Sequence, residues 1–294
     1  MLAYHFMANA FRAGTIVAVI AGAMGWFVVL RRQAFASHTL ALVGFPGAAG
    51  ATWLGVSAIW GYYGFCVGAA LLIAALPHGA AAGRSEESAG IGIIQAFALA
   101  CGFLFVSLYR GFLNGVNALL FGSFLGITDA QVVVLLVVGA IALAVLVVVG
   151  RPLLFASVDP DVAGARGLPV RALSVLFLVL LGLTVAAVSQ VTGTLLVFAL
   201  LVMPAATAQA LTARPALSLG LSVGLAVAVT WAALTASYYS PYPIGFWVTS
   251  FAFAAYVAAA AAPRVLLARP ARSARPARPA RAARPARRPG RPRR

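Results

Sequence analysis

The sequence predicts an all-α, polytopic membrane protein that crosses the bilayer eight to nine times. Of its 294 residues, 63% are hydrophobic and only 9% are charged, whereas a soluble domain carries about 25% charged residues. The apolar residues form long runs, such as that at Gln131–Val149, which lack the alternation of membrane barrel strands. Because backbone polar groups inside a bilayer need internal hydrogen-bond partners, we expect these runs to be helices.

Nine apolar segments are separated by short breaks rich in Gly, Pro or Arg. The second is short, so eight crossings also agree with the sequence. Its Gly44, Gly47 and Gly50, with Pro46, predict close helix packing and a bend. The stretch Tyr109–Thr128 is only moderately apolar, and we expect an interfacial or re-entrant piece there. The segments are Phe11–Leu30, Ser37–Thr52, Leu54–Leu76, Ala89–Leu108, Ala130–Val149, Ala172–Val188, Thr192–Leu211, Leu217–Ala236 and Ile244–Ala262.

The arginines predict the orientation of the chain in the membrane. Successive breaks alternate between arginine-rich ones and breaks that hold only Arg12 and Arg110. The positive-inside rule places the first set in the cytoplasm, so we expect a multi-pass protein of the bacterial cytoplasmic membrane with its N-terminus outside. The arginine-rich set comprises Arg31, Arg32, Arg84, Arg151, Arg166, Arg171, Arg214 and the C-terminal tail.

The net charge of +16 comes mostly from the C-terminal tail. All 21 basic residues are arginines, and twelve of them lie after Ala262, which leaves nine arginines against five acids in the rest of the chain. We expect residues 1–262 to form the transmembrane domain and 263–294 to form a disordered, cytoplasmic Arg/Pro/Ala-rich tail. The basic charge therefore does not indicate nucleic-acid binding; contact of the tail with membrane lipids is the functional alternative.

The longest cytoplasmic break predicts a two-turn helix lying on the membrane surface. Asp159 suits the N-cap, Pro160 the first helical position, and Asp161 the positive first turn. Arg166 suits the last turn, and Gly167 the left-handed position that ends a helix. Such a helix is either an ordinary surface loop or a segment that docks into a groove on a partner. Its side chains expected to be exposed are small: Val162, Ala163, Gly164 and Ala165.

Three separated blocks resemble the permease subunits of zinc/manganese/iron-type ABC importers. They are AGAMGWFVVLRRQAFASHTLALVGFPGAAGA near the N-terminus, DPDVAGARGLP in the long break, and VTGTLLVFALLVMPAATAQAL after it. The resemblance covers about Phe11 to Tyr256 and implies a permease bundle like that of cobalamin importers. It also implies that Asp159–Gly167 is the coupling helix that meets the ATPase subunit.

The same resemblance implies the partners of the chain. They are a cytoplasmic ABC ATPase, an extracytoplasmic metal-binding protein, and a second permease copy, either identical or a sister subunit. A P-loop needs a lysine, and this chain has none, so we expect it not to be an enzyme and ATP hydrolysis to occur on a separate subunit. We expect no permanently bound cofactor, only a transported divalent metal, zinc or manganese.

His38 is the candidate metal ligand of the translocation path. Ionisable residues within spans are costly and suggest function. Related permeases usually carry an Asp with a His four residues later, and here these positions are His38 and Leu42. One candidate ligand therefore remains, with Ser37 and Thr39 as neighbours that could complete a weak site. The alternative is that His38 hydrogen-bonds to a neighbouring helix.

Two other classes of function compete with a permease. A standalone secondary transporter or exporter would need no coupling helix, and it usually shows internal repeats, of which none is clear here. An intramembrane enzyme would need a paired nucleophile and base, and Gly122-Ser123 lacks an intramembrane His beside it. The sequence leaves open which metal is carried and whether the permease pairs with itself.

Overall fold

A computed structural model describes residues 5–76, 84–108, 122, 126–194 and 196–267. Nine helices of 15 residues or more lie in this described part, which confirms the all-α prediction, and seven of them are long and apolar enough to cross a membrane. The exceptions are α2 and α9. The helices are α1 (His5–Leu30), α2 (Ala34–Trp53), α3 (Ala58–Ala75), α4 (Arg84–Leu108), α6 (Asp129–Val158), α7 (Pro160–Ala165), α8 (Val170–Thr192), α9 (Val197–Leu211), α10 (Pro215–Tyr239) and α11 (Ile244–Leu267).

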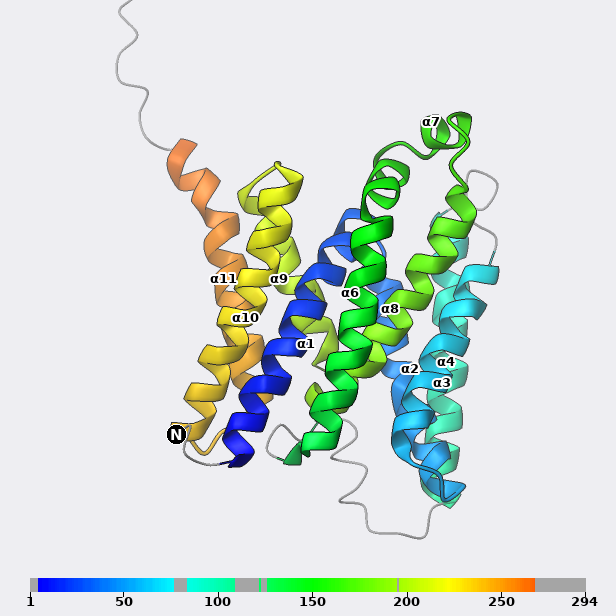
Figure 1. The fold of residues 1–294 in the computed structure, drawn as a ribbon, viewed down its shortest axis with the longest axis vertical. Coiled ribbons are helices and arrows are strands. Elements are labelled where there is room, and N and C mark those ends of the chain that lie inside the picture. The colour runs from blue at the N-terminus through cyan, green and yellow to red at the C-terminus, as the bar shows by residue number, and fades with distance from the viewer. Residues whose placement is uncertain (1–4, 77–83, 109–121, 123–125, 195, 268–294) are drawn as a thin grey trace, which may run out of the picture.

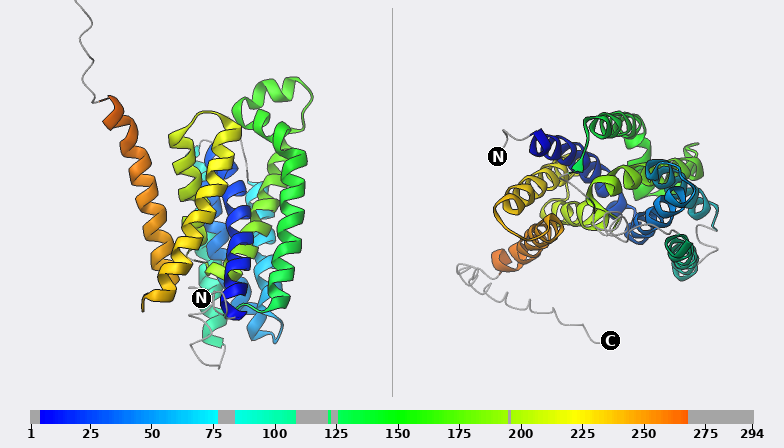
Figure 2. Two further views of the ribbon diagram at one scale, coloured as in Figure 1. Left: turned by 60° about the vertical axis from the view of Figure 1, so that its left-hand side comes forward. Right: turned by 90° about the horizontal axis from the view of Figure 1, so that it is seen from below.

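The long helices run side by side between two ends of a bundle, and the short helix α7 lies at one of these ends (Figure 1). The first residues of α1 lie at the opposite end. Viewed end-on, α2, α3 and α4 gather on one side and α9, α10 and α11 on the other, with α1, α6 and α8 between them (Figure 2). The sequence-distant helices α1, α8 and α9 therefore meet near the centre.

Burial separates central helices from peripheral ones. In the most apolar 18-residue window of α1, 72% of the residues are buried, against 17% in the corresponding windows of α4 and α11. The buried helix α1 is also rich in small residues, because helices in a membrane associate by close packing rather than by hydrophobicity. Most of the large exposed side chains of α4 and α11 are apolar, as a surface facing lipid or another subunit requires.

Glycines allow two pairs of helices to touch backbone to backbone. A side chain at Gly25 of α1 would collide with the backbone carbonyl group of Leu201 in α9. A side chain at Gly47 of α2 would collide with the carbonyl oxygen of Gly61 in α3. The close packing predicted for the glycines of the second segment is thus confirmed, and Pro46 lies inside α2.

Several predicted boundaries differ from the observed helices. The α6 helix continues through Val158, nine residues beyond the predicted apolar run, because a helix can extend past the hydrocarbon layer into the interface. The α4 helix begins at Arg84, five residues before the predicted apolar segment, so Glu86 and Glu87 lie in its first turn. The α11 helix extends to Leu267, five residues past the predicted span. Most of Tyr109–Thr128, and the tail after residue 267, lie outside the described residues.

Candidate functional site

The start of α7 is built as the sequence predicts. The backbone N–H of Val162 donates to the Asp159 side chain at 3.0 Å, so Asp159 caps the helix. Pro160 occupies the first helical position, where a missing N–H has no consequence. Asp161 lies in the first turn, where the helix dipole favours a negative charge. These contacts fix where the chain leaves α6 and turns along the end of the bundle.

The end of α7 is a Schellman motif centred on Gly167. Gly167 has a φ of +80°, a conformation that glycine adopts without strain. Its N–H donates to the carbonyl of Gly164 at 2.9 Å, and the N–H of Leu168 donates to the carbonyl of Ala163 at 3.1 Å. Both ends of this six-residue helix are therefore fixed by local hydrogen bonds, which confirms the predicted helix.

The prediction that Ala163 is exposed is wrong. Its side chain is fully buried and attaches α7 to the bundle, because i→i+3 and i→i+4 spacing directs one side of so short a helix inward. Val162, Gly164 and Ala165 are exposed, and nothing lies within 4 Å of a side chain built at Gly164. The Arg166 guanidinium lies 5.8 Å from the centre of the Phe155 ring. The helix thus presents a small-residue surface to solvent.

His38 lies on α2, a little over one turn from its start. The imidazole is half-buried and meets the Phe198 ring of α9 edge-on, with the ring centres 5.1 Å apart. Between Ala36 and Gly50, every residue of α2 is buried except His38 and Leu42. Because these two residues are four apart, they lie on one face of the helix. This face is the part of central α2 that the rest of the chain leaves partly open.

Ser37 and Thr39 do not assemble around His38. The Ser37 hydroxyl is buried and donates to the backbone carbonyl of Ala34 at 2.8 Å. The buried Thr39 hydroxyl donates to the Gln95 side chain of α4, also at 2.8 Å. Neighbours on a helix point about 100° apart, so the three side chains diverge. Within the described residues, no group of three or more His, Cys, Asp or Glu side chains could hold a metal ion.

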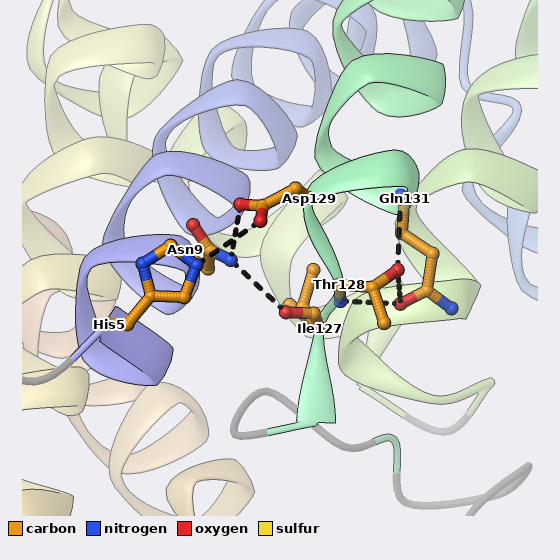
Figure 3. A network of polar contacts seen from close by, with 6 residues as sticks. All are labelled: His5, Asn9, Ile127, Thr128, Asp129 and Gln131. Carbon is orange, nitrogen blue, oxygen red and sulfur yellow. Dashed lines mark hydrogen bonds and ion pairs between the residues drawn. The ribbon is translucent and has the colours of Figure 1, made fainter.

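A polar joint at the end of the bundle opposite α7 escaped the sequence analysis (Figure 3). The side chain of Asn9 in α1 is buried and donates to Asp129 Oδ1 of α6 at 2.8 Å. His5 Nε2 lies 3.2 Å from the other carboxylate oxygen. Thr128 caps α6 in a reciprocal capping box with Gln131. Because His5 and Asp129 are 124 residues apart, no local pattern could have paired them.

A second joint links the same helices at the α7 end. Arg31 follows α1, and its two terminal nitrogens donate to Ser157 of α6 at 3.0 Å and to Ser174 of α8 at 2.7 Å. The guanidinium also lies over the Phe177 ring, 5.1 Å from its centre. Burial lowers the pKa of Arg31 from its ordinary value. Together the two joints hold α1 and α6 at both ends of the bundle.

A bundle of long apolar helices, with the short capped helix α7 between α6 and α8, agrees with the permease bundle that the sequence resemblance implies. The chain belongs to the ABC 3 transport family, whose sequence model matches residues 3–262. It is therefore a transport component of the metal type that the resemblance implied.

Relatives of known description agree with this assignment. The chain is 33% identical over 220 residues to the manganese transport system membrane protein MntC of Halalkalibacterium halodurans, covering 73% of this chain and 72% of that protein. It is 30% identical over 207 residues to the manganese import system permease protein ScaB of Streptococcus gordonii, covering 70% and 72%.

A solved structure supports the same fold. The structure of PsaBC from Streptococcus pneumoniae in complex with Fab contains a chain that superposes with a TM-score of 0.77 at 27% identity, covering 87% of this chain and 91% of that one. The arrangement of helices is therefore that of the matched chain in this structure.

Proposed function

We propose that this chain is the permease of an ATP-driven importer of divalent metal cations, with manganese as its principal cargo. The observation that carries the proposal is the similarity to two manganese permeases over more than two thirds of the chain. The sequence contains no lysine and so no usual P-loop, which fits a transporter whose ATP is hydrolysed on a separate subunit. An extracytoplasmic metal-binding protein would deliver the cation to the opposite face.

The α7 helix is the proposed contact with the ATPase. Its exposed residues include the small Gly164 and Ala165, so a groove on the partner can close around this part of the helix backbone. Its caps at Asp159 and Gly167 make it rigid without help from the partner, which lowers the entropy lost on docking. The arginine-rich end of the bundle, where α7 lies, is the proposed cytoplasmic end, and the N-terminus is then outside.

The test of coupling uses an exposed position rather than buried Ala163. Ala165→Arg places a long side chain on the docking surface without entering the core. The variant should be as abundant in the membrane as the wild type, but the ATPase should no longer copurify with it from host membranes, and manganese uptake should fall at least about tenfold. Ala213→Arg, at an exposed position in the α9–α10 turn at the same end, is the matched control.

Two results would contradict the coupling role. If Ala165→Arg retains both the ATPase and uptake, α7 is an ordinary surface loop. If Ala213→Arg causes the same loss, added positive charge rather than the docking surface is responsible.

The open face of α2 is the proposed metal path. It carries one imidazole at His38, with an aliphatic residue at Leu42, so one protomer offers a single strong ligand. Weak binding suits a path from which the ion must leave. A second copy of the permease, related by a two-fold axis that runs along this face, would bring a second imidazole. Waters and backbone carbonyls would complete the coordination, since Ser37 and Thr39 point elsewhere.

Substitution at His38 tests the path in the same uptake assay. His38→Ala should reduce manganese uptake strongly while ATPase copurification stays normal. His38→Asp should restore uptake and raise the preference for manganese over zinc, because carboxylate suits Mn²⁺ better than imidazole does. Wild-type uptake by His38→Ala would mean that the imidazole only packs against Phe198. If the wild type moves no divalent metal, the proposed cargo is wrong although the family assignment stands.

A further inference from the structure

A cavity of about 1050 Å³ opens at the α7 end of the bundle. It lies between the α1–α2 link, the ends of α3 and α6, and the first turns of α4 and α8. Three arginines line it, Arg31, Arg32 and Arg171, against one carboxylate, Glu87. A wall with this excess of positive charge repels a divalent cation, so the cavity is a poor exit for metal and a favourable place for an anion.

Arg31 supplies a fixed positive charge at this cavity. Its terminal nitrogens are held by Ser157 and Ser174, and its Nε is buried without a hydrogen-bond partner. Both partners are neutral hydroxyls, so they orient the guanidinium without cancelling its charge. The charge is therefore uncompensated by these contacts and preorganised for an anion in the cavity.

Arg32 occupies a position where the fold elsewhere uses glycine. Helices α1, α2 and α7 all end in the same hydrogen-bond pattern, and the left-handed residues of the last two are Gly55 and Gly167. In α1 this residue is Arg32, with a φ of +57°. Glycine would relieve the strain. With arginine instead of glycine at this position, the backbone is strained, but an exposed guanidinium is placed at the cavity.

Besides polar residues such as Gln33 and Ser88, the cavity wall has an apolar part. Phe35, Ile91 and Val175 line it beside the arginines, and all three come from helices of the membrane bundle. A free phosphate ion would gain nothing from these side chains. A phospholipid gains from both parts, since its phosphate can meet the arginines while its glycerol and upper acyl chain lie along the apolar wall.

We propose that this cavity binds the headgroup phosphate of an anionic phospholipid from the adjacent leaflet. Arg32 and Arg171 contact the phosphate, and Arg31 fixes the positive potential behind them. Because Pro160 of α7 also lines the cavity, the bound lipid lies against the base of that helix.

The test compares lipid binding to the purified full chain by native mass spectrometry. Phosphatidylglycerol and phosphatidylcholine with identical acyl chains are titrated into the protein in detergent. The variant Arg32→Gly/Arg171→Gln removes two charges and leaves a residue that tolerates the left-handed turn, so it should fold. Its affinity for the first phosphatidylglycerol should fall about thirtyfold, whereas Arg214→Gln, an exposed arginine at the same end that does not line the cavity, should bind as the wild type does.

Four results would overturn the proposal. Equal wild-type affinity for the two lipids, or unchanged phosphatidylglycerol affinity in the double variant, would show that the arginines do not bind the headgroup. Displacement of phosphatidylglycerol by submillimolar inorganic phosphate, but not by chloride at equal ionic strength, would identify a free-phosphate site. Loss of ATPase copurification with lipid binding intact would assign the arginines to a carboxylate of that subunit.

Discussion

The two ends of α1 are joined to α6 by contacts of opposite charge and opposite burial. At the end away from α7 the centre is an acid, Asp129, whose side chain is 68% exposed. Its partner His5, which forms an ion pair with it when protonated, is 75% exposed. At the α7 end the centre is a cation, Arg31, which is half-buried and held by hydroxyls from α6 and α8. The helices α1 and α6 are thus joined at one end by the exposed contact between His5 and Asp129. At the other end they are joined by the partly desolvated charge of Arg31.

This difference in burial indicates which of the two joints contributes more to stability. An exposed ion pair gains little, because water and salt screen it. A half-buried cation has given up part of its hydration, so its hydrogen bonds to the two serines replace water that burial has removed. The joint near α7 should therefore be the stronger and the more sensitive to substitution, and α7 itself rests on this rigid end.

The largest expected loss of stability follows substitution of Ala163, the buried residue of α7. Ala163→Arg forces a long charged side chain into a fully buried position and should cost about 4 kcal/mol or more, detaching α7 from the bundle. Limited proteolysis of the purified protein should then cleave near residues 159–168. Ala165→Arg, on the exposed side of the same helix, should keep the wild-type cleavage pattern. Equal resistance of the two variants would mean that burial of Ala163 does not anchor the helix.

The local architecture of α7 was predictable from sequence, but its inward-facing side was not. Asp159, Pro160 and Gly167 act through neighbours three to five residues away, so their spacing alone specified both caps. Which side of the helix is buried depends on α6 and α8, and six residues are too few for an apolar stripe to reveal it. Ala163 was therefore placed on the wrong side.

The long apolar helices were equally predictable from the sequence, whereas the long-range contacts were not. Long apolar runs specified the helices because the bilayer leaves them no alternative structure. His38 was identifiable as a rare ionisable residue within an apolar segment, yet its Phe198 neighbour lies 160 positions along the chain. The joints at Asp129 and Arg31 likewise pair residues more than 100 positions apart. Such contacts follow from helix packing, which periodicity does not encode.

Removing the guanidinium at Arg31 should cause the second-largest loss of stability. Arg31→Met keeps a long apolar side chain against Phe177 but removes the two hydrogen bonds to Ser157 and Ser174. We expect a loss of about 2 kcal/mol, seen as a lower melting temperature in detergent that salt does not restore. Arg151→Met, at an exposed arginine of α6, is the control and should leave the melting temperature unchanged. A melting temperature of Arg31→Met equal to the wild type would mean that desolvation cancels these bonds.

The smallest expected loss of stability follows substitution of His5. Unlike the loss at Arg31, it should depend on salt. His5→Gln removes the ion pair with Asp129, but the buried Asn9 side chain still donates to the same carboxylate at 2.8 Å and lies 3.5 Å from the carbonyl of Ile127. Because these contacts remain, α1 should stay attached to α6. In a buffer acidic enough to protonate His5, we expect a small decrease in melting temperature at low salt. It should disappear at about 1 M salt, where charges are screened within about 3 Å. Arg12→Gln, at an exposed arginine two turns further along α1, controls for the general loss of positive charge at this end. A decrease as large as that of Arg31→Met, and insensitive to salt, would show that the exposed pair carries the joint and that the inferred difference between the two ends is wrong.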